Sequence, residues 1–462
     1  MTEHAVVLGA GIAGLLAAAV LADAGDRVTI VERDRLPDTP SQRRGIPQGR
    51  HLHSVLSKGW QTIEGLVPGL IGDMVNAGAH VLDDARLGAR MHIQNGPYGF
   101  NRTDPVADPA ALANYLVTRP QLEYALRRRV EDLPNVAIAD GQDVIALVAG
   151  SPDRITGVTV TDRQTGATRT LDAGLVVDAT GRATRTPLLL EQLGFPRPPQ
   201  RAFAACGVYY SQHITIGEQD SFPERLVLVI PPGGAGRGGL IAGEQDTWTL
   251  TIATRADDHQ RPPECLSDML TRAETFVPAH IIPALRRARA LTDVAVYRYP
   301  GGTWHRYDQS DRLPVGLLVV GDALCCLDPI HGQGITMAAR HALALREHLR
   351  RHGSADPKLF YQTLADIIAP VWATNRPPDP HRHRSVADRA RHRLLTWTQH
   401  KVLEAAADDI VVTECLVRIV NMIDPPQRLL QPRVMARVAA HHARRTLPLS
   451  DRQPTHRTTA DA

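Results

Sequence analysis

Three glycines near the N-terminus constrain the fold of this chain more than any other feature. An apolar run leads into Gly9, and Gly11 and Gly14 complete the spacing G-x-G-x-x-G. An alanine- and leucine-rich stretch over residues 12–24 is typical of a helix, and a second apolar run ends in Glu32. Strand, tight turn, helix and strand, in this order, are the parts of a unit that binds a dinucleotide.

Each of these residues has a physical task in such a unit. Gly9 allows the tight turn, Gly11 has no side chain to block a pyrophosphate, and Gly14 lets the helix pack closely on the strand. The free N–H groups at the start of the helix attract phosphate. Glu32 follows at a distance of about 20 residues, where a carboxylate accepts hydrogen bonds from ribose hydroxyls. We therefore predict a dinucleotide site; the alternative is a glycine-rich turn without a ligand.

Length, charge and cysteine content limit the class of protein. A chain of 462 residues is long for one core, so two or three lobes are expected. The net charge of +3 gives no electrostatic reason to expect nucleic-acid binding. No other stretch reaches about 18 uninterrupted apolar residues, so no membrane span is expected. Five scattered cysteines without metal spacing favour a reducing compartment, which we take to be the cytoplasm, and no metal site.

The order of apolar runs predicts an α/β fold with a second sheet. Short β-rich runs between residues 203 and 254 follow one another without a helix, which is typical of an antiparallel sheet. The glycine-rich run 233–239 lies between two of them, and we interpret it as a hairpin because no helix follows. The predicted fold is a Rossmann-like domain of the GR2 type with an antiparallel substrate domain and a helical C-terminal region. The boundaries are residues 1–80, 107–190 and 295–350 for the first, 81–106 and 191–294 for the second, and 351–462 for the third.

Two local predictions concern the middle of the chain. Residues 81–106 carry turn signals and are expected to be irregular. Residues 114–130 have a helical pattern, with a start signal at Thr118. Pro120 suits a first helical position, and the residue before a proline, Arg119, is expected to be extended.

A second candidate ligand site lies far along the chain. A buried apolar run ends in Gly321 and Asp322, and a glycine pair, Gly332 and Gly334, precedes a helix predicted over residues 334–351. An acid at a strand end can bond a polyol hydroxyl, and the helix start offers N–H groups and positive potential to an anionic ring. The alternative for Asp322 is simple helix capping.

A basic loop follows the first unit. Arg43 and Arg44 either reach over phosphates, line a cofactor face or belong to a solvated loop. His51 is either a proton carrier or a cap for the following helix, whereas for His53 we favour capping or packing. The arginine- and histidine-rich stretch 381–393 is interpreted as a solvated helix face, with contact to an acidic partner as the alternative.

Three separated pieces together resemble a known family. They are the glycine turn with Glu32 and Arg33, the strand end at residues 178–181, and the segment 321–334. Over residues 3–350 the chain resembles the single-component FAD monooxygenases of the para-hydroxybenzoate hydroxylase fold. The segments 47–53 and 328–334 look closest to the actinobacterial epoxidases of polyether and related natural-product pathways, which are cousins of squalene epoxidase.

This resemblance implies an FAD site. The glycine turn with Gly9, Gly11, Ala13 and Gly14 would hold the pyrophosphate, and Glu32 would bind the adenosine ribose with Arg33 beside it. Arg43 or Arg44, and Arg119, would reach the phosphates or the ribityl chain, and the backbone of Val144 would meet adenine. Asp322 would bind the ribityl or pyrophosphate region. The flavin pyrimidine edge would be met by Gly332, Gln333, Gly334 and Ile335, and Pro329 is a further cofactor-binding candidate. No catalytic residue is assigned; the candidates on flavin-facing loops are Arg44, Gln48, His51 and His331.

The resemblance also implies a reaction. FAD reduced by NAD(P)H would react with O2 to give a C4a-hydroperoxyflavin, which inserts one oxygen atom into a hydrophobic natural-product intermediate. Epoxidation of an alkene is favoured over hydroxylation because the sequence shows no clear catalytic dyad or triad. No second nucleotide fold is evident, so NAD(P)H would use a shared transient site or a separate flavin reductase. The alternatives are an FAD-dependent reductase or dehydrogenase of isoprenoid-type substrates, and a binding protein without flavin.

Overall fold

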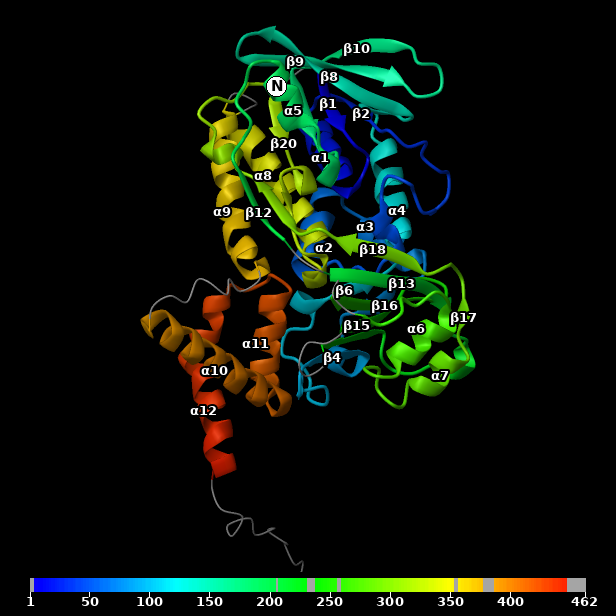
Figure 1. The fold of residues 1–462 in the computed structure, drawn as a ribbon, viewed down its shortest axis with the longest axis vertical. Helices are drawn as coiled ribbons and strands as arrows, with labels where there is room; N and C mark the ends of the chain where they lie inside the picture. The colour runs from blue at the N-terminus through cyan, green and yellow to red at the C-terminus, as the bar shows by residue number, and fades with distance from the viewer. Residues whose placement is uncertain are drawn as a thin grey trace, which may run out of the picture.

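The structure is a computed structural model with two large sheets and a separate group of C-terminal helices (Figure 1). The parallel sheet and its helices form the upper part in Figure 1, the second sheet lies below, and the C-terminal helices, in orange and red, lie to one side. The structure describes residues 4–204, 207–230, 237–255, 259–352, 356–376 and 386–446.

The first sheet has five parallel strands in the order β20-β11-β1-β2-β7. The strands are β1 (His4–Leu8), β2 (Arg27–Val31), β7 (Val136–Ala139), β11 (Leu175–Asp178) and β20 (Leu317–Val319). Its central strands are buried on both faces, as their unbroken apolar sequences predict, and Val6, Val7 and Val176 have no exposed surface. This sheet confirms the predicted α/β class.

Helices cover this sheet, and α1 packs against α8 (Figure 1). They are α1 (Ile12–Asp23), α2 (Ser57–Leu66), α3 (Leu70–Asn76), α4 (Arg119–Glu131), α5 (Thr186–Gln192), α8 (Gly334–His352) and α9 (Pro357–Asn375). Most residues of helix α1 are buried, which agrees with its apolar sequence on every side. The helix ends before Gly25, whose positive φ of 88° suits glycine. A three-stranded sheet extends the domain, with β8 (Gln142–Ser151), β9 (Arg154–Asp162) and β10 (Thr168–Asp172).

The second sheet has eight strands, and all its pairs are antiparallel except one. It contains β4 (Met91–Asn95), β5 (Tyr98–Gly99), β13 (Gly207–Thr215), β14 (Leu226–Ile230), β15 (Arg237–Ala242), β16 (Thr247–Arg255), β17 (Arg289–Ala290) and β18 (Ala295–Tyr299). Helices α6 (Leu266–Ala273) and α7 (Ile282–Arg286) pack on its core. The expectation that residues 81–106 are irregular is wrong, because β4 pairs in parallel with β14. Residues 233–236 of the predicted hairpin, and Cys206, lie outside the described residues.

The predicted helix over residues 114–130 is wrong in its first turn. Asn114–Leu116 forms strand β6, which pairs with β3 (His80–Leu82), and Asn114 Nδ2 donates to Ser57 Oγ at 3.0 Å. Helix α4 begins at Arg119, so this residue is helical and not extended as predicted. Thr118 caps the helix by accepting a hydrogen bond from Gln121 N at 3.4 Å. Tertiary pairing of the strand overrides the local helical pattern.

The C-terminal helices form a small core of their own and dock on the rest of the chain. They are α10 (Val386–Asp408), α11 (Ile410–Val420) and α12 (Pro432–Thr446). Asn421 Oδ1 accepts from Ser57 N at 3.0 Å, and Asn101 N donates to Ala406 O at 3.0 Å. Of the predicted basic stretch 381–393, residues 381–385 lie outside the described residues. A last small sheet joins β12 (Gln200–Phe203), β19 (Gly302–His305) and β21 (Cys325–Cys326).

Two features are absent from the described part of the chain. Within it, no helix is both long enough and apolar enough to cross a membrane. Nor do its histidine, cysteine and acidic side chains gather in any group of three that could hold a metal ion. The predicted domain boundaries stay a prediction.

The close packing of the glycine turn yields a stability prediction. A Cβ atom at Gly14 would lie 1.8 Å from Gly9 O, a backbone atom that cannot move aside cheaply. We expect Gly14→Ala to lower the free energy of unfolding by about 2 kcal/mol or more, measured by urea denaturation. The matched control is Gly65→Ala at an exposed position of α2, where a Cβ meets nothing within 4 Å and should stabilise by about 0.5–1 kcal/mol. Equal effects of the two substitutions would contradict the packing argument.

Candidate functional site

The candidate site lies at the carboxyl edge of the parallel sheet. Strand β1 leads into the turn at Gly9, β2 into Glu32, and β20 into Asp322. Because the carboxyl ends of parallel strands meet at the same edge, these three groups share one side of the sheet. The sequence predicted this convergence from segments that are about 300 residues apart.

The glycine turn leaves open space in front of α1. Gly9 has φ of +99°, and its N–H donates to Val31 O at 2.7 Å. A Cβ atom at Gly11 would meet only Ile46 Cδ1, at 3.7 Å. A ligand can therefore approach the backbone at Gly11 and the first N–H groups of α1, as a dinucleotide site requires.

Glu32 is a buried carboxylate with fixed orientation. Its Oε2 accepts from Ala10 N at 2.7 Å, and its Oε1 accepts from Asp34 N at 2.9 Å. Arg43 Nη1 lies 3.5 Å from Oε2. Two hydrogen bonds and one ion pair leave acceptor capacity on the two oxygens for a ligand hydroxyl.

A row of buried charges connects Glu32 with α4. Arg43 Nη2 donates to Glu123 Oε2 at 3.4 Å, and Arg119 Nε donates to Glu123 Oε1 at 2.7 Å. Arg43 Nη1 is buried and has no hydrogen-bond partner among the described residues. This nitrogen can therefore donate a hydrogen bond to an oxygen atom of a bound ligand. Sequence reasoning missed Glu123, although its i, i+4 spacing from Arg119 was a usable signal.

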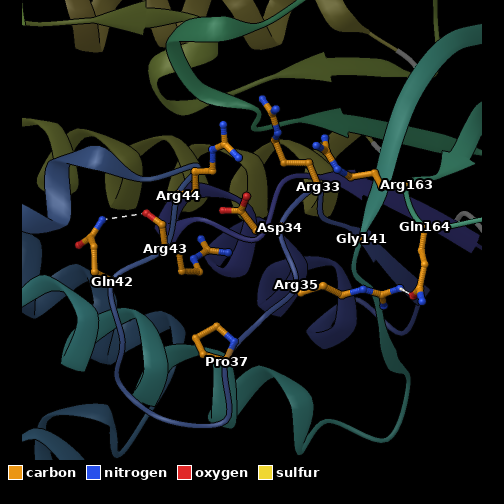
Figure 2. Close-up of a pocket in the computed structure, with 10 residues that line it drawn as sticks. All are labelled: Arg33, Asp34, Arg35, Pro37, Gln42, Arg43, Arg44, Gly141, Arg163 and Gln164. Atoms are coloured by element: carbon orange, nitrogen blue, oxygen red, sulfur yellow. Dashed lines mark hydrogen bonds between the residues drawn. The ribbon is translucent and has the colours of Figure 1, made fainter.

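A cavity of about 490 Å³ opens beside this row of buried charges (Figure 2). It is lined by Arg33, Asp34, Arg35, Pro37, Gln42, Arg43, Arg44, Gly141, Arg163 and Gln164. Arg35 pairs with Asp140 at 2.9 Å and Arg163 with Asp143 at 2.9 Å. Arg33 and Arg44 have no such partner in the described ranges, and Figure 2 shows their guanidinium groups pointing to the same side. The cavity therefore favours anionic or hydrogen-bond-accepting groups.

The carboxylate of Asp178 holds the turn after β11 in place. Its Oδ1 accepts from Thr180 N at 2.8 Å and Thr180 Oγ1 at 2.6 Å. Its Oδ2 accepts from Thr184 Oγ1 and Thr186 Oγ1, both at 2.6 Å. All four acceptor sites of this fully buried carboxylate serve the turn after β11.

That turn carries Arg182, which sits between the two large sheets. Arg182 Nη2 donates to Gly301 O at 2.7 Å, and the guanidinium lies 5.2 Å from the centre of the Tyr299 ring. Burial raises the pKa of Asp322, and the charges of Arg119 and Arg182 oppose this rise. Cys326 Sγ lies 3.8 Å from Asp322 Oδ2 as a weak donor, and burial raises the pKa of this thiol, so it stays protonated. Arg182 was not predicted as a site residue.

The segment before α8 forms a second rigid turn. The 3₁₀ helix η9 (Pro329–His331) is capped by Asp328, whose Oδ1 accepts from Ile330 N at 3.0 Å and from Tyr209 OH at 3.1 Å. Gly332 follows with φ of +62°, and α8 begins at Gly334. The turn thus presents a helix N-terminus at the carboxyl edge and is bonded to the second sheet.

Loop residue His51 faces the second sheet. Its Nδ1 lies 2.9 Å from Ser211 Oγ, which lies 2.7 Å from Thr251 Oγ1, and its ring centre is 5.8 Å from that of Tyr297. Burial, then the neighbouring His213 and Arg50 charges, lower the pKa of His51 from 6.5 to about 4. His51 is therefore a neutral, weakly basic side chain.

The other candidates on flavin-facing loops are carried by different segments of the chain. Gln48 is half-buried in η1 (Pro47–Arg50), and His331 is exposed at the end of η9. Val144 lies on β8 and is not among the residues that line the cavity. The ligand roles assigned to these residues stay predictions.

Comparison with known proteins identifies what the chain is similar to. A family model described as "FAD binding domain" matches residues 2–366. Protein Rv3254 of Mycobacterium tuberculosis is 33% identical over 461 residues, which cover 96% of this chain and 94% of that protein. Kynurenine 3-monooxygenase of Salinispora tropica is 26% identical, over 81% of this chain and 79% of that enzyme. Squalene monooxygenase of Mus musculus is 28% identical, over 78% of this chain and 54% of that enzyme.

A solved structure shows the same fold over four fifths of the chain. The crystal structure of PqsL, a probable FAD-dependent monooxygenase from Pseudomonas aeruginosa, has a TM-score of 0.61 at 17% identity. The match covers 80% of this chain and 93% of that chain. The predicted fold class is therefore confirmed, whereas the particular resemblance to polyether epoxidases stays a prediction.

Buried His341 yields a pH prediction. Its Nδ1 accepts from Gly321 N at 3.0 Å, and burial, followed by the Arg340 charge, lowers its pKa from 6.5 to about 3. The unfolded chain takes up this proton below pH 6.5 and the folded chain does not, so the free energy of unfolding falls as the pH drops from 6.5 toward 3. Asparagine can keep the acceptor but does not titrate.

We therefore expect His341→Asn to lose less stability than the native chain between pH 7 and pH 5, by about 1–2 kcal/mol in urea denaturation. The control is His352→Asn at an exposed position near the end of the same helix. A parallel pH dependence of native chain and His341→Asn would show that His341 is protonated in the fold.

Proposed function

Because the chain belongs to the FAD-binding-domain family and is an FAD-dependent oxidoreductase, we propose that it is a monooxygenase that epoxidises a hydrophobic small molecule. The model match over residues 2–366 shows the FAD-binding-domain family, and relatives named as monooxygenases support the reaction class. The proposal adds the reaction and the substrate class. Squalene monooxygenase, whose name records an apolar substrate, supports the substrate class.

The residues present fit FAD. The pyrophosphate would lie against Gly11 and the start of α1, where a Cβ atom would have open space. The unsatisfied Arg43 Nη1 would donate to an oxygen of the cofactor, and Glu32 would accept from ribose hydroxyls. Asp322 would meet the ribityl region, and the start of α8 would face the ring. The whole row of groups lies at one edge of the sheet.

Bound FAD, reduced by the NAD(P)H typical of the family, would activate O2, of which one atom is transferred to the substrate and the other leaves as water. The chain has to exclude water, orient the substrate and hold the ring. The positive end of helix α8 would lie at the ring edge, where it would stabilise negative charge. Tyr209 OH donates to Asp328 and so links the second sheet to this edge.

The choice of epoxidation is carried by His51, His53, Tyr209 and Tyr299, which are the candidate bases considered among the described residues, and none of which is a strong base near neutral pH. The pKa of His51 is lowered to about 4, mainly by burial, and that of His53 to about 3, again mainly by burial and then by Arg119. Burial raises the pKa of Tyr209 and of Tyr299, so both phenols stay protonated. Hydroxylation of a phenol gains from a base with a pKa near the working pH, whereas oxygen transfer to an alkene needs none.

Oxygen labelling tests the reaction. We expect purified protein with FAD and NAD(P)H to consume O2 faster when an apolar polyene is added, and the product to carry one ¹⁸O atom from ¹⁸O2. Turnover of the same polyene without O2 would instead indicate a reductase or dehydrogenase. Activity that appears only when a separate flavin reductase is added would show that this partner, and not a shared transient site, delivers the electrons.

The neutral state of His51 gives a prediction on pH dependence. We expect the rate of product formation to be flat between pH 5.5 and 8, about the range in which an ordinary histidine titrates. His51→Gln should keep this flat profile and lower kcat by less than about tenfold. A profile that rises with a pKa near 6.5 in the native enzyme and is lost in His51→Gln would identify His51 as a base.

Glu32 gives a prediction on cofactor affinity. We expect Glu32→Gln to raise the Kd for FAD by about tenfold or more, because a charged acceptor of ligand hydroxyls is lost. The control is Glu64→Gln, since Glu64 also accepts two backbone N–H bonds, from Gly69 at 2.7 Å and Ile71 at 2.9 Å, away from the site. Fluorescence titration with FAD measures both. Equal losses of affinity would show that Glu32 acts through stability alone.

A further inference from the structure

Asn375 connects the last residue of α9 with the turn that precedes α8. It lies beyond the segment that the family model matches, which ends at residue 366. Its side chain is buried, with 5% of the residue exposed. Asn375 Oδ1 accepts from Asp328 N at 3.0 Å, and Nδ2 donates to Gln333 Oε1 at 2.8 Å. One amide thus holds both ends of the segment from Asp328 to Gln333.

The orientation of this amide is set by the backbone. The N–H of Asp328 can only donate, so the atom of Asn375 that faces it must be the oxygen. Nδ2 must then point the other way, where it donates to Val371 O at 2.9 Å and to Gln333. The contact with Val371 O independently supports this orientation, because a backbone carbonyl can only accept.

The orientation of Asn375 in turn sets that of Gln333. Because Oε1 of Gln333 faces the donor Nδ2, its other atom must be the NH2 group. This NH2 group has no hydrogen-bond partner among the residues that the structure describes. Gln333 is half-buried and directly precedes α8, at the edge where the flavin is proposed to lie. An oriented and unused pair of N–H donors remains at this edge.

We propose that Asn375 is a positioning residue that fixes Gln333 as a hydrogen-bond donor to a carbonyl oxygen of the flavin. The proposal rests on the proposed function, because it needs FAD at this edge. It assigns a task in cofactor binding to a residue of the C-terminal part of the chain. Hydrogen-bond donation to a ring carbonyl favours the electron-rich reduced ring, so Asn375 acts on both the affinity and the spectrum of the cofactor.

The test uses Asn375→Asp, which keeps the size of the side chain and replaces its NH2 donor with a carboxylate oxygen. Aspartate still accepts from Asp328 N but cannot donate to Gln333 Oε1, so Gln333 turns its NH2 group toward the carboxylate and its oxygen toward the cofactor. We expect the Kd for FAD to rise about tenfold, because one hydrogen bond is lost and the Gln333 oxygen then faces a carbonyl oxygen of the cofactor. We also expect the visible absorption bands of bound FAD to shift. Gln333→Leu should raise the Kd and shift the bands as well.

Two comparisons separate positioning from a structural role. If Asn375 acts through Gln333, adding Asn375→Asp to Gln333→Leu changes the Kd by less than about twofold, because the two effects are not additive. The matched control is Asn135→Asp, which also removes two bonds from Nδ2, to Ala22 O at 2.9 Å and Asp26 O at 2.8 Å, at the opposite edge of the sheet. It should lower stability and leave the FAD spectrum unchanged.

The outcomes are distinct. Native protein that binds no FAD overturns the proposed function and this inference together. Native protein that binds FAD, with Asn375→Asp giving an unchanged Kd and spectrum, overturns the inference alone. Full additivity of the two substitutions, or an equal spectral shift in Asn135→Asp, also overturns it, because the effect of Asn375 would then pass through general stability.

Discussion

The carboxyl edge of the parallel sheet depends on the placement of one buried guanidinium group. Arg43 lies between Glu32 and Glu123, with Nη–Oε distances of 3.5 Å and 3.4 Å, and its side chain is 7% exposed. A buried charge without partners would cost several kcal/mol, on the order of 3–5, so the loop that carries Arg43 must follow the positions of both carboxylates. The end of β2, the basic loop and α4 are thereby fixed relative to one another. Arg119, the next residue in this row of buried charges, donates to Glu123. Its charge also opposes the rise in the pKa of Asp322.

The dinucleotide unit was predictable because its determinants are local. Gly9 and Gly14 meet within one turn, and Glu32 ends the next strand, so spacing alone encodes their contact. Glu123 and Asn375 were not predictable in the same way, since their partners Arg43 and Gln333 are 80 and 42 residues away. A single sequence contains no signal for such pairs beyond the i, i+4 spacing within α4.

The errors in the expected secondary structure have the same origin. The first turn of the helix expected from residue 114 is a strand because Asn114 bonds to Ser57, a contact that no window of local residues records. Strand β4 was taken for a loop because turn signals surround it, and because its partner, β14, lies more than 100 residues further on. In both places, pairing with distant segments decides the conformation, and the local pattern is too weak to oppose it.

Charged side chains are concentrated at one end of the site. Fixed charges gather at the end near β2, where five arginines line the cavity around Glu32 and Asp34. Toward the second sheet two ionisable side chains are held neutral, since burial lowers the pKa of His51 and raises that of Tyr209. Neither side chain acts as a strong acid or base near neutral pH, so proton transfer gains little from them. An oxygen atom transferred to an apolar molecule moves no proton from that molecule, so this division of charge is what the proposed epoxidation requires.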